Sequence, residues 1–367
     1  MDCNLLKNKV VYALSFLIAL VYSTTVFGQS HDKNLPKEHS KTEDSDATHA
    51  EGKYNAGEVI MHHITDSHEW ELYSKGHTHI SIPLPVILLN MDHGFSVFMF
   101  NKFDHGHSPY KGYYLDKEHH IQTQDGSAFY DLSITKNVFA MIISSLFLFF
   151  IFRSVAKRYE ANPLKAPSGM QNLFEVLIIF VRDEVVKPML KENTIRFLPY
   201  LLTIFFFIWF NNMLGLLPAA ANVTGNIAVT VTLALFTFFI TMKSSSRHYW
   251  HHLLTAPGVP GGVKPILILV EVLSIFTKPF ALLIRLFANM TAGHLIVLSF
   301  LSLIFIFGEM SAVAGYGITI FSVAFSIFLY CLELLVAALQ AYIFTNLSAL
   351  FISEVLPHDN HHEELAH

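Results

Sequence analysis

Apolar residues gather into five long runs after residue 130, and the runs predict membrane-spanning helices. Residues 134–152, 195–217 and 223–242 are each long enough to cross most of a hydrocarbon core of about 30 Å. Residues 266–307 and 312–355 form two longer runs of about 40 residues each. Because this is about twice the length of a perpendicular crossing, we expect the last two helices to be strongly tilted.

The segments between these runs have a different pattern. Residues 169–190 alternate charged and apolar positions, which predicts an amphipathic helix at the membrane interface. Residues 243–265, "KSSSRHYWHHLLTAPGVPGGVKP", are polar and rich in Gly and Pro, which predicts a loop.

The N-terminal part reads as an export signal followed by a polar segment. Lys7 and Lys9 precede a short apolar stretch, and the pattern predicts a signal peptide over residues 1–28, cleaved after Gly28; an uncleaved anchor helix is the alternative. Residues 29–130 are histidine-rich, and their first part is typical of a disordered segment. "HTHISIPLPVILLN" and "GFSVFMFNKF" within this segment predict short strands.

Composition supports a membrane protein. The chain is 52% hydrophobic and only 14% charged, whereas about a quarter of a soluble domain is charged. The expected fold class is therefore an all-α polytopic membrane protein with about five membrane helices and a partly disordered N-terminal region. A net charge of −5 gives no basic signature for nucleic acid, and two cysteines exclude a disulfide framework. We expect neither a bound cofactor nor a structural metal.

Basic residues in the short loops predict the orientation of the chain. They follow the first and third runs, and the positive-inside rule places both loops in the cytoplasm. The residues are Lys157, Arg158, Lys165, Lys243, Arg247 and Lys264. Residues 29–130 then lie outside, in the periplasm, residues 131–357 form the membrane domain, and residues 358–367 are a cytoplasmic tail.

Several ionisable residues interrupt the fourth apolar run. Glu271, Lys278 and Arg285 are spaced by seven, and Asn289 follows Arg285 by four, so they share roughly one stripe of a helix. A charge at mid-bilayer costs at least about 2.5–3.5 kcal/mol. Lys278 could instead reach the interface, Asn289 could join two helices, and Arg285 could sit in a buried salt bridge. Arginine does not release its proton, so Arg285 could also hold a permanent positive charge where a mobile acid must deprotonate.

The last run carries a matching pattern. Glu333, Ala337 and Gln340 are spaced by four and three, so they share a helix face. If the two long helices are antiparallel, Glu333 and Gln340 could face His294 and Arg285. An isolated buried histidine is usually structural, but His294 with Glu333 available is a candidate proton relay.

Four ordered motifs resemble the a subunit of the F-type ATP synthase: "NNMLGLLP", "VEVLSIFTKPFALLIRLF", "RLFANMTAGHLIV" and "LQAYIFTNLSALFISE". The resemblance covers about residues 130–355. It implies that Arg285 is the essential arginine facing the c-ring, with Gln340 near it. It also implies roles for Asn289 one turn on, Glu271 at the cytoplasmic path and Asn212 before the Leu-Leu-Pro turn, with Lys278 secondary. His294 and Glu333 stand where other members carry the reverse pair.

The resemblance implies a non-catalytic subunit of the cell inner membrane. Its expected role is to provide two offset half-channels that load and unload protons on the c-ring, coupling proton flow to rotation and ATP synthesis. Its expected partners are the c-ring, b-type peripheral stalk subunits, the lipid bilayer and, indirectly, the F1 sector.

A histidine-rich metal ion transporter is the alternative function. His77 with His79, and His105 with His107, could hold zinc or copper through neutral imidazoles. We favour instead a hydrophilic external segment in which histidine is merely common, because no cysteine joins these pairs and their spacing forms no closed four-ligand motif.

Overall fold

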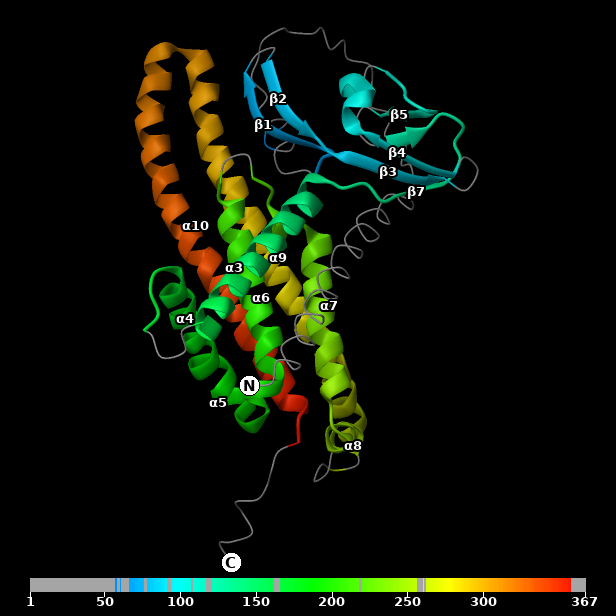
Figure 1. Cartoon of the computed structure of the whole chain (residues 1–367), viewed down its shortest axis with the longest axis vertical. Helices are drawn as coiled ribbons and strands as arrows, with labels where there is room; N and C mark the ends of the chain where they lie inside the picture. The colour runs from blue at the N-terminus through cyan, green and yellow to red at the C-terminus, as the bar shows by residue number, and fades with distance from the viewer. Residues whose placement is uncertain are drawn as a thin grey trace, which may run out of the picture.

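The computed structural model describes residues 66–75, 78–90, 94–106, 108–116, 121–161, 166–217, 220–255 and 262–357, together with Gly57, Ile60 and Pro260. The predicted signal peptide and the tail at 358–367 lie outside these residues. A bundle of long helices carries a small β region at one end (Figure 1). The turn between the last two helices lies at that same end, whereas α8 and the end of α10 lie at the opposite one.

Five helical segments of the described chain are long and apolar enough to cross a membrane. This confirms the predicted all-α polytopic fold. The segments contain α3 (Lys136–Ala161), α6 (Thr194–Gly215), α7 (Ile227–Ser244), α9 (Lys264–Met310) and α10 (Ala312–Val355).

The two long C-terminal helices form an antiparallel hairpin (Figure 1). At 47 residues α9 is about 70 Å long, well beyond the thickness of a bilayer. The helices meet closely at the turn, because a Cβ added to Gly315 would lie only 2.9 Å from the Cα of Gly308. The length of both helices is confirmed, and their inclination to a bilayer stays a prediction.

The segment before α6 is helical as predicted but not uniform. It consists of α4 (Met170–Phe180), a π-helical turn (Val181–Val186) and α5 (Lys187–Leu190). A 3-10 turn at Lys191–Asn193, with Lys191 at a φ of 45°, separates it from α6. Its position at the membrane interface stays a prediction.

The predicted loop at 243–265 is partly wrong, because it contains α8 (Arg247–Thr255). Leu253 is buried, and α8 packs against α9. The backbone N–H of Ser246 also donates to the carbonyl of Val355 at the end of α10. Polar composition suggested a loop, but burial against a neighbouring element favours this short helix.

The β region consists of small antiparallel sheets, and the strands predicted within 77–90 and 94–103 are confirmed. Two sheets are hairpins, and the third has the order β4-β3-β7. One face of the third sheet packs under η2 (Phe100–Gly106) and contributes Val86, Leu88 and Phe98 to a buried cluster. The strands are β1 (Glu69–Lys75), β2 (Thr78–Pro83), β3 (Pro85–Asn90), β4 (Gly94–Met99), β5 (Tyr113–Leu115), β6 (Ile121–Thr123) and β7 (Phe129–Asp131).

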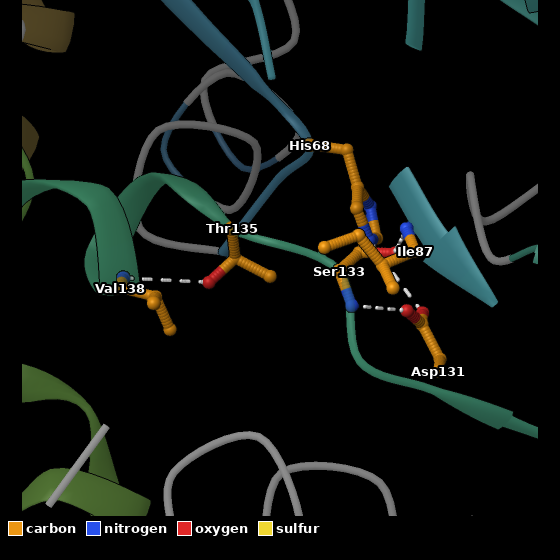
Figure 2. Close-up of polar contacts among 6 residues, drawn as sticks. All are labelled: His68, Ile87, Asp131, Ser133, Thr135 and Val138. Atoms are coloured by element: carbon orange, nitrogen blue, oxygen red, sulfur yellow. Dashed lines mark hydrogen bonds and ion pairs between the residues drawn. The ribbon is translucent and has the colours of Figure 1, made fainter. Parts of the chain in front are cut away.

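The β region passes into α3 through a hydrogen-bonded connection (Figure 2). Ile87 donates its N–H to the Ser133 hydroxyl at 3.0 Å, and the Ser133 N–H donates to Asp131 at 2.8 Å. His68 Nε2 lies 3.6 Å from Asp131 Oδ2. Thr135 accepts from the Val138 N–H at 3.5 Å, as an N-cap residue does.

The segment that leads into β1 also binds the first turn of α3. Asp66 accepts from the Asn137 N–H at 3.1 Å, and the carbonyl of Ser67 accepts from the Lys136 N–H at 2.8 Å. The Trp70 ring packs edge-on against Phe139 with centroids 5.7 Å apart. These contacts hold the β region in one orientation on α3.

Candidate functional site

A cavity of about 570 Å³ between α9 and α10 brings together four of the predicted site residues. Arg285 and Asn289 line it from α9, and Glu333 and Gln340 line it from α10. Each pair lies on one helix face because its spacing is four or seven residues. The remaining lining is apolar or glycine.

The two helices contribute different environments to this cavity. Arg285 and Asn289 are exposed, whereas Glu333 is 6% and Gln340 only 3% exposed. Within the described part of the chain, Arg285 forms no ion pair with a carboxylate. The guanidinium therefore stands on the open side of the cavity, and the acid and the amide lie on its inner side.

The Glu333 carboxylate is buried without a hydrogen-bond donor among the described residues. It rests on the backbone of Gly293, where a side chain would collide with it. A buried carboxyl group without partners is costly when ionised, so this position suits a group that exchanges a proton.

His294 is placed differently from the expectation. It is buried next to Gly293, but it does not line the cavity. Neither oxygen of Glu333 has a hydrogen-bond partner among the residues that the structure describes, so no hydrogen bond joins it to His294. The predicted relay between them would need a bridging water or a side-chain movement, and it stays a prediction.

Asn212 of α6 does not line the cavity, but it contacts the segment of α10 that does. Its Nδ2 donates to the carbonyl of Ala337 at 3.1 Å, and its Oδ1 accepts from the Thr224 hydroxyl at 2.6 Å. Ala337 lies between Glu333 and Gln340 on the same face of α10. Asn212 thus fixes the position of the α10 segment that carries both polar groups.

A second cavity, of about 170 Å³, lies at the opposite end of the bundle near α8. Glu271 and Lys278 line it from α9, and Glu354 lines it from the end of α10. Lys278 forms an ion pair with Glu354 and lies 5.5 Å from the centre of the Phe351 ring. One oxygen of Glu271 is buried without a partner among the described residues.

The two cavities are separated along α9. Arg285 follows Glu271 by fourteen positions, which corresponds to about 21 Å of helix. The predicted stripe of charges therefore extends from one cavity to the other.

The structure adds site residues that sequence reasoning did not identify. Glu354 and Tyr249 line the second cavity, Thr224 orders Asn212, and Gly293 makes room for Glu333. A carboxylate at the end of an apolar run could have indicated Glu354. Tyr249 carried no such signal, because its segment was assigned to a loop.

No group of three or more potential metal ligands occurs among the described residues. His77 and His107, from the alternative metal-transport reading, lie outside those residues.

Two family models match the chain. Residues 138–353 match the family described as ATP synthase A chain. Residues 59–139 match one described as Domain of unknown function (DUF8433), which corresponds to the β region and its junction with α3.

Curated proteins are similar over most of the chain. ATP synthase subunit a of Chloroherpeton thalassium is 47% identical over 240 residues, covering 64% of this chain and 70% of the relative. Its counterpart in Chlorobium phaeobacteroides (strain BS1) is 42% identical over 329 residues, covering 87% and 82%. ATP synthase subunit a 2 of Prosthecochloris aestuarii is 41% identical over 329 residues, covering 88% and 86%. With more than half of its length matched by the family model, the chain belongs to the ATP synthase A chain family and is a multi-pass membrane subunit of that enzyme's proton-transporting sector.

Proposed function

We propose that this chain provides the two offset half-channels through which protons reach and leave a rotating c-ring. The observation that carries the proposal is the position of Arg285, a permanent cation on the exposed side of a cavity that also holds Glu333 and Gln340. In both α9 and α10, only 22% of the most apolar stretch of the helix is buried inside the chain. The hairpin therefore offers a wide surface to a ring of apolar helices.

The entry half-channel begins at the end of the bundle that carries the β region. A proton moves inward past Asn212, His294, Glu333 and Gln340 and neutralises a carboxylate on the c-ring. The neutral site can then rotate through lipid, where an ionised carboxylate would be too costly. In this arrangement Asn212 positions α10, and Glu333 supplies the buried group that exchanges the proton.

The exit half-channel is the second cavity, at the α8 end. Glu271 provides an acceptor there, and the ion pair of Lys278 with Glu354 gives the opening a polar wall. Arg285 separates the two half-channels, because a fixed positive charge repels a proton and favours the ionised form of a nearby carboxyl. Each proton that crosses a potential of 100 mV yields about 2.3 kcal/mol for rotation.

The orientation follows from the basic loops. The cavity that Glu271 lines opens to the cytoplasm, and the C-terminal tail lies on the same side. The β region lies on the periplasmic side of the inner membrane. Further partners in this proposal are b-type peripheral stalk subunits and, through them, the F1 sector. The chain catalyses no bond-breaking step itself.

The test replaces Arg285 in the assembled enzyme. Arg285→Ala should abolish proton-driven ATP synthesis and ATP-driven proton pumping in membrane vesicles, with the complex still present at wild-type abundance. Arg196→Ala is a matched control, because Arg196 is an exposed arginine on α6 that lines neither cavity. Wild-type coupling in Arg285→Ala vesicles would refute the proposal.

A further inference from the structure

The β4-β3-β7 sheet has one face that is both exposed and apolar. Burial alternates along its strands, so that one set of side chains enters the core under η2 and the other set points outward. The outward set contains Phe95, which is 65% exposed, and Tyr130, which is 58% exposed. We call the five residues Leu89, Phe95, Val97, Met99 and Tyr130 the outer apolar face.

The outer apolar face is continuous. Leu89 pairs with Phe95 on one side and with Tyr130 on the other, so the three side chains lie next to one another across the sheet. Val97 and Met99 continue the surface along β4. None of the five is charged, and water is a poor environment for a contiguous apolar surface that includes two aromatic rings.

The sheet is held close to the boundary of the membrane. Only residues 132–135 connect β7 to α3, and four residues span at most about 14 Å. This connection is bound to β3, since Leu132 donates to the carbonyl of Ile87 at 2.8 Å and Ile134 to that of Pro85 at 3.2 Å. The apolar part of α3 begins at Val138 and ends before Arg153, so the helix must enter the hydrocarbon near its first turn.

The covered and uncovered faces of the sheet look in opposite directions. The inward face packs against Phe100 and Phe103 of η2 and against Tyr113 of β5. The outer apolar face is the opposite one, and the sheet lies at the end of the bundle where α3 begins (Figure 1). Aromatic and aliphatic side chains at this level suit the boundary between headgroups and acyl chains, where Tyr and Trp are enriched.

We propose that the outer apolar face docks on the bilayer leaflet that α3 enters, with Phe95, Val97 and Tyr130 at the boundary of headgroups and acyl chains. The β region is then a membrane-surface module that is held on α3 and continues the lipid-facing surface of the helices. Docking would hold α3, and through it the bundle, at a defined depth and tilt. This role is independent of proton transfer at Arg285.

The experiment measures the depth of a spin label in the full-length chain. A nitroxide is attached at Val97→Cys, in a background with Cys3→Ser and Cys331→Ser, and the chain is placed in nanodiscs of phosphatidylethanolamine and phosphatidylglycerol. Gln122→Cys is the matched control, because Gln122 is an exposed strand residue of the same β region outside the outer apolar face. Power saturation then compares accessibility to oxygen, which concentrates in lipid, with accessibility to a water-soluble nickel complex.

We expect the oxygen-to-nickel ratio at Val97 to exceed that at Gln122 several-fold. A label at Phe95→Cys gives a second position should the first variant fold poorly, and it should show the same ratio. Equal ratios at Val97 and Gln122 would place the face in water and overturn the proposal. A Val97 label that is immobilised and shielded from both reagents would mean that a protein covers the face, which would also overturn it.

Discussion

Glu333 of α10 lies against Gly293 of α9, with its Oε1 3.0 Å from the position that a Cβ of residue 293 would take. The missing side chain allows the buried carboxylate to reach across to the opposite helix. The same contact places Glu333 beside the residue that precedes His294. The position of the acid within the cavity thus depends on a glycine as much as on the acid itself.

Gly293→Ala should lower proton transport without unfolding the chain. The added methyl would displace only the flexible end of Glu333, so the helices can stay packed while the carboxylate moves. A small displacement of a reacting group costs a large factor in rate, and we expect at least a several-fold fall in ATP-driven proton pumping. Gly317→Ala is the control, because a Cβ at that helical position meets nothing within 4 Å. Equal pumping by both variants would contradict the predicted role of the contact.

Alanine substitutions at Asn211 and Asn212, two adjacent buried residues of α6, should both lower stability, but only one of them should lower proton pumping. Asn212 bonds to Thr224 and to α10, whereas Asn211 donates to the carbonyl of Phe207 and accepts from Ser144 on α3. Replacing either by Ala leaves a buried hydroxyl without that partner, at a cost of about 1–3 kcal/mol in unfolding free energy. Only Asn212→Ala should reduce proton pumping per assembled enzyme, measured in vesicles beside the thermal midpoint. A comparable loss of proton pumping in Asn211→Ala would contradict a specific role of Asn212 in proton transport.

The ion pair between Lys278 and Glu354 should contribute little to stability. The two side chains are 30% and 38% exposed, and solvent screens such pairs, so their coupling free energy is expected to be about 1 kcal/mol or less. A double-mutant cycle with Lys278→Ala and Glu354→Ala, read by unfolding in mixed micelles, measures it. A coupling of several kcal/mol would show that the pair is shielded from water.

Asparagine substitutions at Asp131 and Asp66, which lie at the junction with α3, should have different effects on the stability of the β region at neutral pH. Burial raises the pKa of Asp131, but His68 and Ser133 outweigh it and hold this pKa below its ordinary value. The carboxylate therefore stabilises the fold above the unfolded pKa of about 4, and this contribution is lost as the pH falls through the folded pKa. Asp131→Asn should speed amide exchange in β3 and β7 at neutral pH, and the difference from wild type should vanish in acid.

Burial raises the pKa of Asp66, and the N–H of Asn137 offsets this only in part. When the pKa of an acid is higher in the folded than in the unfolded state, the fold loses stability as the pH rises from the unfolded pKa to the folded pKa. Asp66→Asn, which can still accept from Asn137, should therefore leave protection at neutral pH unchanged or increased. Faster exchange in this variant than in Asp131→Asn would show that the charge of Asp66 is needed.

Much of the helical fold could be predicted from the chain because apolar runs of this length have few alternatives in a membrane. The end of the last helix at Val355 and the end of α5 at Leu190 agree with the residues at which the patterns stop. The helix α8 could not be predicted, since seven of its nine residues are polar or aromatic and the helix is stabilised here by packing on α9.

The candidate site, like the fold, could be predicted only in part. Spacing by four and seven residues placed Arg285 with Asn289 and Glu333 with Gln340, and the cavity contains all four. Spacing could not show that His294 would lie outside it, because periodicity defines a direction around one helix axis but not the offset between two helices.

The amino-acid sequence by itself determined the number of long apolar helices, the face on which each intramembrane charge lies, and the family to which the motifs point. These properties are local, since they depend on residue type and on the 3.6-residue repeat of one helix. Only the tertiary structure decided that Glu333 meets Gly293, that Asn212 bonds to Ala337, and that one face of the β4-β3-β7 sheet stays uncovered. Those relationships arise from how separate elements pack, and packing depends on the shapes of all the side chains between them.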